Sequence, residues 1–398
     1  MIHIKKQTLT TSLILLTVIL MDLLAGMEFD LFVPSFPELQ NHFHLTYFWV
    51  EALLSMNFIG YCLSLFFVGG LTDRYGRKPV IIAGLFIFIM GSLLCLYGGS
   101  YPLLLIGRFL QGLGVAAPGI LSFLIIADIY PVKKQQHLMA VLNGVMNIAV
   151  GIAPVIGSYV TLYFHWQGNF MALLLVALPA LVMTSFFIPD FKKPEIQQSL
   201  SPRAYLPIFQ SKPLMLIITY LVVICVPYWV FVGMSPLLYM KALSVSLSHF
   251  GYYQGILAFV FGIGSILFGL IIHKVTPKNM LTFANLIFMI SLIGLAAITI
   301  NNTHNPLLIT LVFLIFVIGQ IIPGTILYPI TLNLMPDAKG RVSAVIRGGL
   351  LIVNAVAIQI ASLTYQGSFQ NIGVIISVFM ILGIITLFFI IRNHGIGV

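Results

Sequence analysis

Long apolar stretches separated by short polar breaks run along almost the whole chain. Each stretch is long enough to cross a bilayer core as a helix, which takes about 20 apolar residues. The pattern predicts twelve transmembrane helices, so we expect an all-α polytopic membrane protein. The predicted segments are 9–36, 46–71, 80–98, 102–129, 138–164, 170–189, 213–241, 250–272, 280–300, 306–334, 343–366 and 371–391.

A polar, proline-containing segment at 190–212 separates the first six predicted helices from the last six. The two parts resemble each other at three places: PLLL at 102–105 and PLLI at 306–309, GVAAPG at 114–119 and GQIIPG at 319–324, and GL at 70–71 and 269–270. Matches of this kind at a similar offset indicate duplicated six-helix halves related as a parallel repeat. We therefore expect a first half at 1–189, a cytoplasmic linker at 190–212 and a second half at 213–398.

Composition and charge agree with this class of protein. The 398 residues are 60% hydrophobic and only 7% charged, with a formal net charge of +9. All but three of the 19 Lys and Arg residues lie on one side of the predicted helices; the others are Arg108, Lys241 and Arg347. This distribution excludes nucleic acid as a partner, because the basic residues follow the loops on one side of a membrane. Since basic loops stay inside, we expect a multi-pass inner-membrane protein with both termini cytoplasmic.

The break after the second predicted helix carries the most specific motif. It reads GGLTDRYGRKP at 69–79 and resembles the signature loop G-x-L-x-D-R-x-G-R-[RK]-P of the major facilitator superfamily. That resemblance implies a fold of two six-helix halves and a charged cluster that latches one conformation from the cytoplasmic side. The residues it assigns to the latch are Gly69, Asp73, Arg74, Gly76, Arg77 and Asp128.

Three acids, Asp22, Glu28 and Asp30, lie in the first apolar stretch. An ionised carboxylate at membrane depth costs about 2.5–3.5 kcal/mol on insertion scales, so an intramembrane acid is first considered functional. On one uninterrupted helix Glu28 would lie about 120° from Asp22 and about 160° from Asp30, so the three could not line one cavity. The alternative is a structural role for one or two of them, hydrogen-bonded to neighbouring helices.

Two more motifs narrow the resemblance. Arg108 begins RFLQG, which resembles the R-x-x-Q-G motif of drug:proton antiporters. A buried arginine needs an anion, and Asp30 lies at a comparable depth; the alternative is an arginine that reaches the outer surface. The predicted fifth helix carries Gly151, Pro154 and Gly157, a partial match to the antiporter motif of that helix, for which close helix packing is the alternative.

The first helix itself resembles the exporters of the bicyclomycin- and chloramphenicol-resistance type, through DLFVPSFP at 30–37. This resemblance implies a secondary active transporter that exports small amphipathic organic compounds in exchange for protons by alternating access. Its proton-coupling residues would be Asp30, Asp22, Glu28 and Arg108. We expect no enzymatic activity, no cofactor and no metal, and we expect a monomer in the bilayer.

Aromatic and amide side chains in the helices suit an amphipathic ligand, although each one singly is also typical of packing. Glu51, at the outer end of the second helix, is expected at the membrane interface. A dedicated exporter of one metabolite, such as a siderophore or an amino-acid derivative, remains an alternative function, as do proton-coupled uptake and a non-transporting sensor. The predicted substrate-binding residues are Asn57, Tyr61, Asn147, Tyr228, Trp229 and Gln320.

Overall fold

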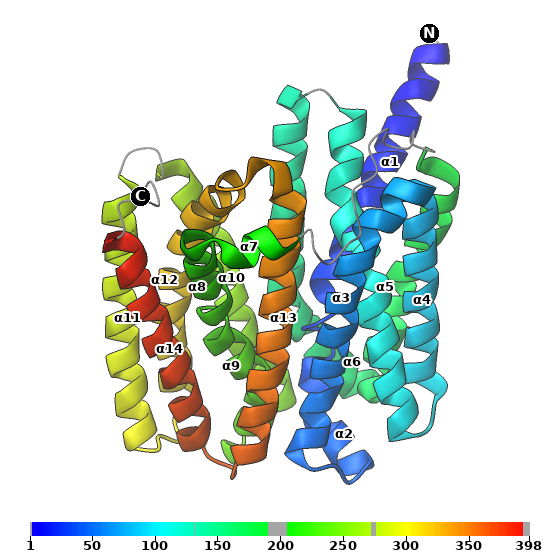
Figure 1. The fold of residues 1–398 in the computed structure, drawn as a ribbon. Helices are drawn as coiled ribbons and strands as arrows, with labels where there is room; N and C mark the ends of the chain where they lie inside the picture. The colour runs from blue at the N-terminus through cyan, green and yellow to red at the C-terminus, as the bar shows by residue number, and fades with distance from the viewer. Residues whose placement is uncertain (1, 131, 190–204, 272–275, 393–398) are drawn as a thin grey trace. The chain divides into compact units, whose positions relative to one another are not determined.

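The structure is a computed structural model that describes residues 2–130, 132–189, 205–271 and 276–392. Helices make up nearly all of the regular structure, and none of the described residues is in a β-strand (Figure 1). The chain forms two compact units, which are described separately. One consists of Met1–Leu39 and Ala52–Leu200, and the other of Gln40–Glu51 and Ser201–Val398.

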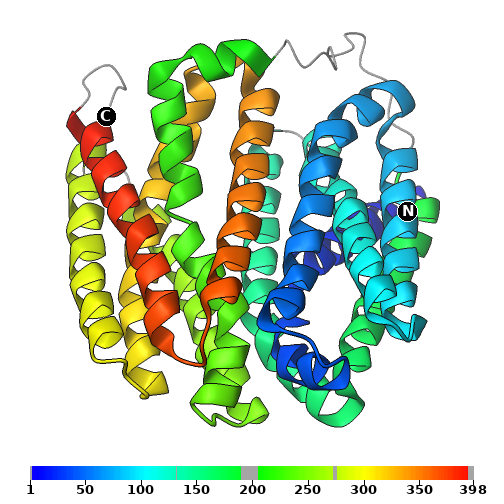
Figure 2. The ribbon, with the colours of Figure 1, turned by 60° about the horizontal axis from the view of Figure 1, so that its bottom comes forward.

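Helices of the first unit include two whose backbones nearly touch. A Cβ added at Gly91 of α4 would lie 2.6 Å from the carbonyl oxygen of Gly107 in α5, so only glycine allows this approach. The two helices accordingly lie side by side in both views (Figures 1 and 2). The helices are α1 (Ile2–Met27), α4 (Arg77–Tyr97), α5 (Tyr101–Ile129) and α6 (Val132–Phe187), while α2 (Phe36–His42) and α3 (Tyr47–Tyr75) cross the boundary between the units.

In the second unit, α11 packs against both α12 and α14, and α13 packs against α8 and α9. Prolines lie in the first turn of several of these helices, where the missing N–H would have no helical partner. The elements are α7 (Leu206–Gln210), α8 (Lys212–Val223), α9 (Val226–Pro236), η3 (Leu237–Ala242), α10 (Leu247–Ile271), α11 (Pro277–Ile300), α12 (Pro306–Asn333), α13 (Lys339–Thr364) and α14 (Phe369–Arg392).

The predicted membrane-spanning segments are present as helices. Among the described residues, ten helical spans are long and apolar enough to cross a membrane, and Ser12–Met27 is a shorter apolar helix. One of the ten, Gly144–Phe187, covers two predicted segments. It bends at His165, whose backbone has a φ of 58° and a ψ of −176°, and this break separates the two. The all-α polytopic fold is therefore confirmed.

One prediction about the first segment is wrong. The uninterrupted helix expected over 9–36 ends at Met27, and a short 3₁₀ helix, η1 (Val33–Ser35), precedes α2. Proline cannot donate the backbone hydrogen bond that continues a helix, and Pro34 and Pro37 lie at the first turns of these two short elements. The angles expected for Asp30 on a single helix therefore do not apply, whereas the backbone N–H of Glu28 still donates to the carbonyl oxygen of Leu24 in α1.

Candidate functional site

Arg108 of α5 is one of the largest fully buried side chains in the protein. Its guanidinium donates from Nη1 to Oε1 of Glu28 at 3.1 Å and to Oε1 of Gln111 at 2.7 Å. Its Nε donates to the backbone carbonyl of Leu53 at 3.4 Å. The ring of Phe32 lies 4.7 Å from the guanidinium carbon, a distance at which the aromatic face attracts the cation. Arg108 is thus held from four directions.

Glu28 shares its Oε1 between two donors. Besides Arg108, the side-chain amide of Asn57 donates to this oxygen, and the same amide nitrogen lies 3.2 Å from the carbonyl oxygen of Arg108. The other carboxylate oxygen of Glu28 and Nη2 of Arg108 have no hydrogen-bond partner among the described residues. The buried ion pair therefore has one acceptor oxygen and one nitrogen with two N–H donors left, to which a proton or a polar ligand group can bind.

A chain of side-chain hydrogen bonds fixes Gln111 behind the ion pair. Its Nε2 donates to Oγ of Ser92 in α4 at 2.7 Å, and Ser92 donates to the carbonyl oxygen of Phe88 at 2.9 Å. Because the amide nitrogen of Gln111 is used in this way, its oxygen faces the guanidinium. The RFLQG motif thus supplies both the cation and the acceptor that orients it.

Close approach of α3 and α5 brings these side chains together. A Cβ added at Gly112 would lie 2.0 Å from the carbonyl oxygen of Asn57, and one added at Gly60 would lie 2.2 Å from the carbonyl oxygen of Phe109. Real Cβ atoms do not approach other atoms so closely, so both positions need glycine. The two glycines place Asn57 beside the backbone of Arg108.

The sequence favoured Asp30 as the partner of Arg108, but the structure pairs the arginine with Glu28. Asp30 is also buried, beyond the end of α1. Asp22 is fully buried within α1, and neither of its carboxylate oxygens has a hydrogen-bond partner among the described residues. All three acids lie in the first unit, in different surroundings.

The predicted latch residues lie at the junction of α3 and α4 and at the end of α5. Gly76 precedes α4 with a φ of 90°, a conformation that favours glycine. Arg77 forms an ion pair with Asp128, and Arg74 lies over the ring of Tyr75. Burial raises the pKa of the Asp128 carboxyl above its usual value, and the neighbouring guanidinium lowers it by less. Gly69 faces open space, while the side chain of Asp73 lies outside the described residues.

The motif predicted for the fifth helix lies in α6. A Cβ added at Gly157 would lie 2.0 Å from the carbonyl oxygen of Leu31, so the helix packs directly on the chain that follows Asp30. The hydroxyl of Ser158 donates to the carbonyl oxygen of Pro154 at 2.8 Å, and Gly151 is buried. Close packing by small residues accounts for the contacts of this motif.

The residues predicted to bind substrate fall in both units. Asn57 belongs to the ion-pair cluster, and Tyr61 is buried with its ring 5.8 Å from that of Phe29. Tyr228 and Trp229 of α9 pack edge to face. Gln320 donates from Nε2 to the carbonyl oxygen of Ile224, at the break between α8 and α9. The side chain of Asn147 lies outside the described residues.

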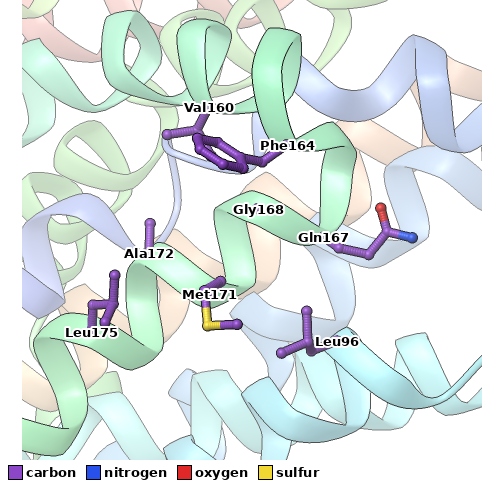
Figure 3. Close-up of a pocket in the computed structure, with 8 residues that line it drawn as sticks. All are labelled: Leu96, Val160, Phe164, Gln167, Gly168, Met171, Ala172 and Leu175. Carbon is purple, nitrogen blue, oxygen red and sulfur yellow. The ribbon is translucent and has the colours of Figure 1, made fainter.

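A separate apolar groove of about 400 Å³ lies along α6 near the end of α4 (Figure 3). Phe164 and Leu175 line it and are 69% and 67% exposed, so the groove opens on a face that a membrane-spanning helix presents to lipid. Gln167 is its one amide side chain (Figure 3). The groove does not include any acid or base of the site described above.

Glu51 does not lie where the sequence predicted. Its side chain was expected at the membrane interface, but it is fully buried. Its place near the end of an apolar stretch was the misleading signal, because hydropathy gives depth along a helix and not the face that packs against neighbours. Within the described part of the chain, no group of three or more His, Cys, Asp or Glu residues could hold a metal ion.

The helical spans and the buried charged cluster define a polytopic membrane protein with ionisable groups inside its helical bundle. The sequence matches the Major Facilitator Superfamily over residues 18–358, and the chain belongs to that family.

Among its relatives, multidrug resistance protein MdtL of Escherichia coli O9:H4 (strain HS) is 29% identical over 174 residues. This stretch covers 44% of the present chain and 44% of that protein. MdtL of Shigella flexneri matches with the same identity and coverage. The match thus spans less than half the length of these relatives.

Solved structures with the same fold are more distant in sequence. The crystal structure of a D-xylose-proton symporter has a TM-score of 0.74 at 16% identity, over 95% of this chain and 97% of the other. A bacterial homologue of the human lysosomal transporter Spinster has a TM-score of 0.71 at 15% identity, over 96% and 97%. These likenesses establish the fold.

Proposed function

We propose that the protein is a secondary active transporter that exports small amphipathic organic compounds, including drugs, in exchange for protons. The observation that carries this proposal is the fully buried Glu28–Arg108 ion pair, in which each partner keeps one polar atom without a hydrogen bond. An intramembrane ion pair of this kind is expensive and is typical of proton or substrate pathways. The name of the MdtL relatives, multidrug resistance protein, supports the choice of substrate class.

Proton coupling would act through the charge on Glu28. A proton on this carboxylate removes the negative charge beside Arg108, while Leu53 and Gln111 still hold the guanidinium in place. The uncompensated positive charge then raises the energy of this conformation, and a rearrangement that hydrates or pairs Arg108 becomes favourable. Asp22 and Asp30 lie in the same unit, so the three acids would share the protons as a set.

Exchange requires that proton and substrate oppose each other. If substrate binds better while the carboxylates are charged, bound substrate weakens proton binding by the same factor by which protons weaken substrate binding. The predicted substrate residues Asn57 and Tyr61 suit this role because Asn57 already contacts Glu28. The other proposed contacts with substrate are Asn147, Tyr228, Trp229 and Gln320.

Alternating access would use the Arg77–Asp128 ion pair as a latch, together with Asp73 and the glycines of the signature loop. The positive-inside rule supports an orientation with both termini and this loop in the cytoplasm. We propose a monomer in the bacterial inner membrane, driven by the proton gradient without a cofactor and with no enzymatic step.

Export of ethidium from proteoliposomes, driven by an imposed pH gradient, tests this function. Wild-type flux should collapse when the gradient is removed. It should also collapse in Glu28→Gln, which keeps the shape of the side chain but cannot take up a proton. Glu38→Gln is the matched control, because Glu38 is partly exposed and contacts His165 instead of Arg108.

Separate Asp22→Asn and Asp30→Asn variants assign the coupling acid. If gradient-driven flux survives in Glu28→Gln and is lost in one of the two aspartate variants, the substituted aspartate, and not Glu28, is the proton-coupling acid. Wild-type flux that does not depend on the pH gradient would contradict proton exchange. Absence of ethidium flux in the wild type would contradict the multidrug function.

A further inference from the structure

Glu51 is a buried acid outside the cluster around Arg108. It belongs to the second unit, whose boundary falls inside α3 directly after this residue. Its side chain points at the backbone of α9, where Oε2 lies 2.7 Å from the position that a Cβ on Gly233 would occupy. The side chain of Ile358 in α13 lies 3.5 Å from the same position. A glycine in α9 thus leaves room for the carboxyl group.

Neither oxygen of Glu51 has a hydrogen-bond partner among the described residues, and the side chain is 0% exposed. The ion pairs found among those residues do not include it. Glu51 therefore lacks the partners that Glu28 has.

No ionisable group of the surrounding elements forms a hydrogen bond or ion pair with Glu51 among the described residues. Lys241 donates to Oδ1 of Asn41 at 2.8 Å and to Oε1 of Gln40. The rings of Tyr47, one turn before Glu51, and Tyr365 pack edge to face, and the hydroxyl of Tyr365 has no hydrogen-bond partner among the described residues. The next groups are Tyr228 on α9 and Lys339, Arg341 and Arg347 on α13, of which Arg347 lies roughly 16 Å along the helix axis from Ile358.

An ionised carboxylate without a counter-charge is very unfavourable in such surroundings, because burial removes its hydration and nothing replaces it. Two arrangements avoid this cost. The carboxyl can carry a proton, or it can pair with a cation. Both remove the net charge that would otherwise be buried.

A second polar group in the same unit is also unpaired. Asn354 of α13 is fully buried, and neither atom of its side-chain amide has a hydrogen-bond partner among the described residues. It lies one helical turn before Ile358, on the same face of α13. A buried polar group without a partner calls for an explanation, and a bound ion, water or ligand group is one such explanation.

We propose that Glu51 is a binding site for the ammonium group of an organic cation, and that a proton occupies it when no cation is bound. An ammonium group supplies both the positive charge and the donors that the carboxylate lacks, and the amide oxygen of Asn354 provides a further acceptor on the same helix face. The site lies in the second unit and is distinct from the Glu28 cluster. Binding of the cation at this site does not depend on the proposed export function. Only the physiological role of the site rests on that function.

Equilibrium binding of doxorubicin and of N-acetyl-doxorubicin to the purified full-length protein tests this site. The two probes share a ring system, but only the first has a protonated amine. Hydrogen bonds to a charged group contribute about 1.5–3 kcal/mol, so Glu51→Gln should weaken doxorubicin binding about ten- to a hundredfold. Binding of the acetylated probe should change less than about twofold.

Equal effects of Glu51→Gln on both probes, or no effect on either, would overturn the proposal. Gly233→Ala offers an independent variant, since its methyl group would displace the carboxyl, and it should also weaken doxorubicin selectively. Infrared difference spectra should show a protonated carboxyl lost on doxorubicin binding in the wild type and not in Glu51→Gln. The same loss in both would assign the proton to another acid and overturn the proposal.

The binding and flux experiments fail independently. Selective loss of doxorubicin binding in Glu51→Gln, together with no gradient-driven flux, would keep the cation site and reject the transport function. Gradient-driven ethidium flux with unselective binding in Glu51→Gln would keep the transport function and reject the site.

Discussion

Nη1 of Arg108 lies 3.1 Å from Oε1 of Glu28, and neither side chain has any solvent exposure. These two residues are far apart in the sequence, and the second acceptor of the guanidinium, Gln111, lies one turn further along α5. The pair therefore links the chain directly after α1 to α5. A buried pair of this kind makes the protein sensitive to the loss of either partner.

Removing one partner of the pair should destabilise the protein strongly. Glu28→Ala leaves a buried guanidinium without a counter-charge, which costs about 3–5 kcal/mol. The double variant Glu28→Met/Arg108→Met should be less destabilised than Glu28→Ala, because no unpaired charge remains. Chemical denaturation in detergent micelles measures both. A double variant less stable than the single one would show that the pair itself contributes net stability.

Gly112 should not tolerate even one added carbon. In Gly112→Ala the methyl group would meet the carbonyl oxygen of Asn57 at 2.0 Å, so α3 and α5 must separate. Overpacking of this kind costs about 1–3 kcal/mol, and the loss of Asn57 from Glu28 should also lower transport. Gly144→Ala is the matched control, since nothing lies within 4 Å of its Cβ position. Equal unfolding midpoints of the two variants would contradict this packing.

The Asp128 carboxyl should make stability depend on pH. Its pKa is raised from the ordinary value of 3.8 by burial, against the smaller opposing effect of Arg77. The folded state thus binds this proton more tightly than the unfolded state does. Its contribution to stability is fully present below the unfolded pKa and is lost as the pH rises through the folded pKa.

We therefore expect the unfolding temperature of the wild type to fall relative to that of Asp128→Asn as the pH increases from about 4 toward neutrality. Thermal unfolding of both proteins across this pH range measures the difference. A wild-type protein that gains stability over Asp128→Asn as the pH rises would show that the attraction of Arg77 outweighs burial.

The break inside α6 should be relieved by glycine. His165 has a φ of 58° and a ψ of −176°, a region that is nearly restricted to glycine and costs about 1–3 kcal/mol for other residues. His165→Gly should therefore raise the free energy of unfolding, offset by the loss of the 3.0 Å contact with Glu38. His165→Ala loses the same contact without relieving the backbone and serves as the control. Equal stability of the two variants would contradict strain at this position.

The sequence alone determined the class of protein and where most of its membrane-spanning helices lie along the chain. Apolar stretches long enough to cross a bilayer are a local property, because a helix satisfies its own backbone in lipid and needs no distant partner. The signature loop ending at Pro79 indicated the family in the same local way, and the match over residues 18–358 agrees with it. The break at His165 left the two predicted helices on either side of it intact.

The tertiary structure alone decided which acid meets Arg108 and where Glu51 is buried. The helical angles expected for the first segment assumed a continuous helix, but α1 ends at Met27, and Glu28, the next residue, pairs with Arg108. Burial of Glu51 depends on the absence of a side chain at Gly233, a residue distant in the sequence. Such pairings follow from contacts between helices, which hydropathy along one helix does not encode.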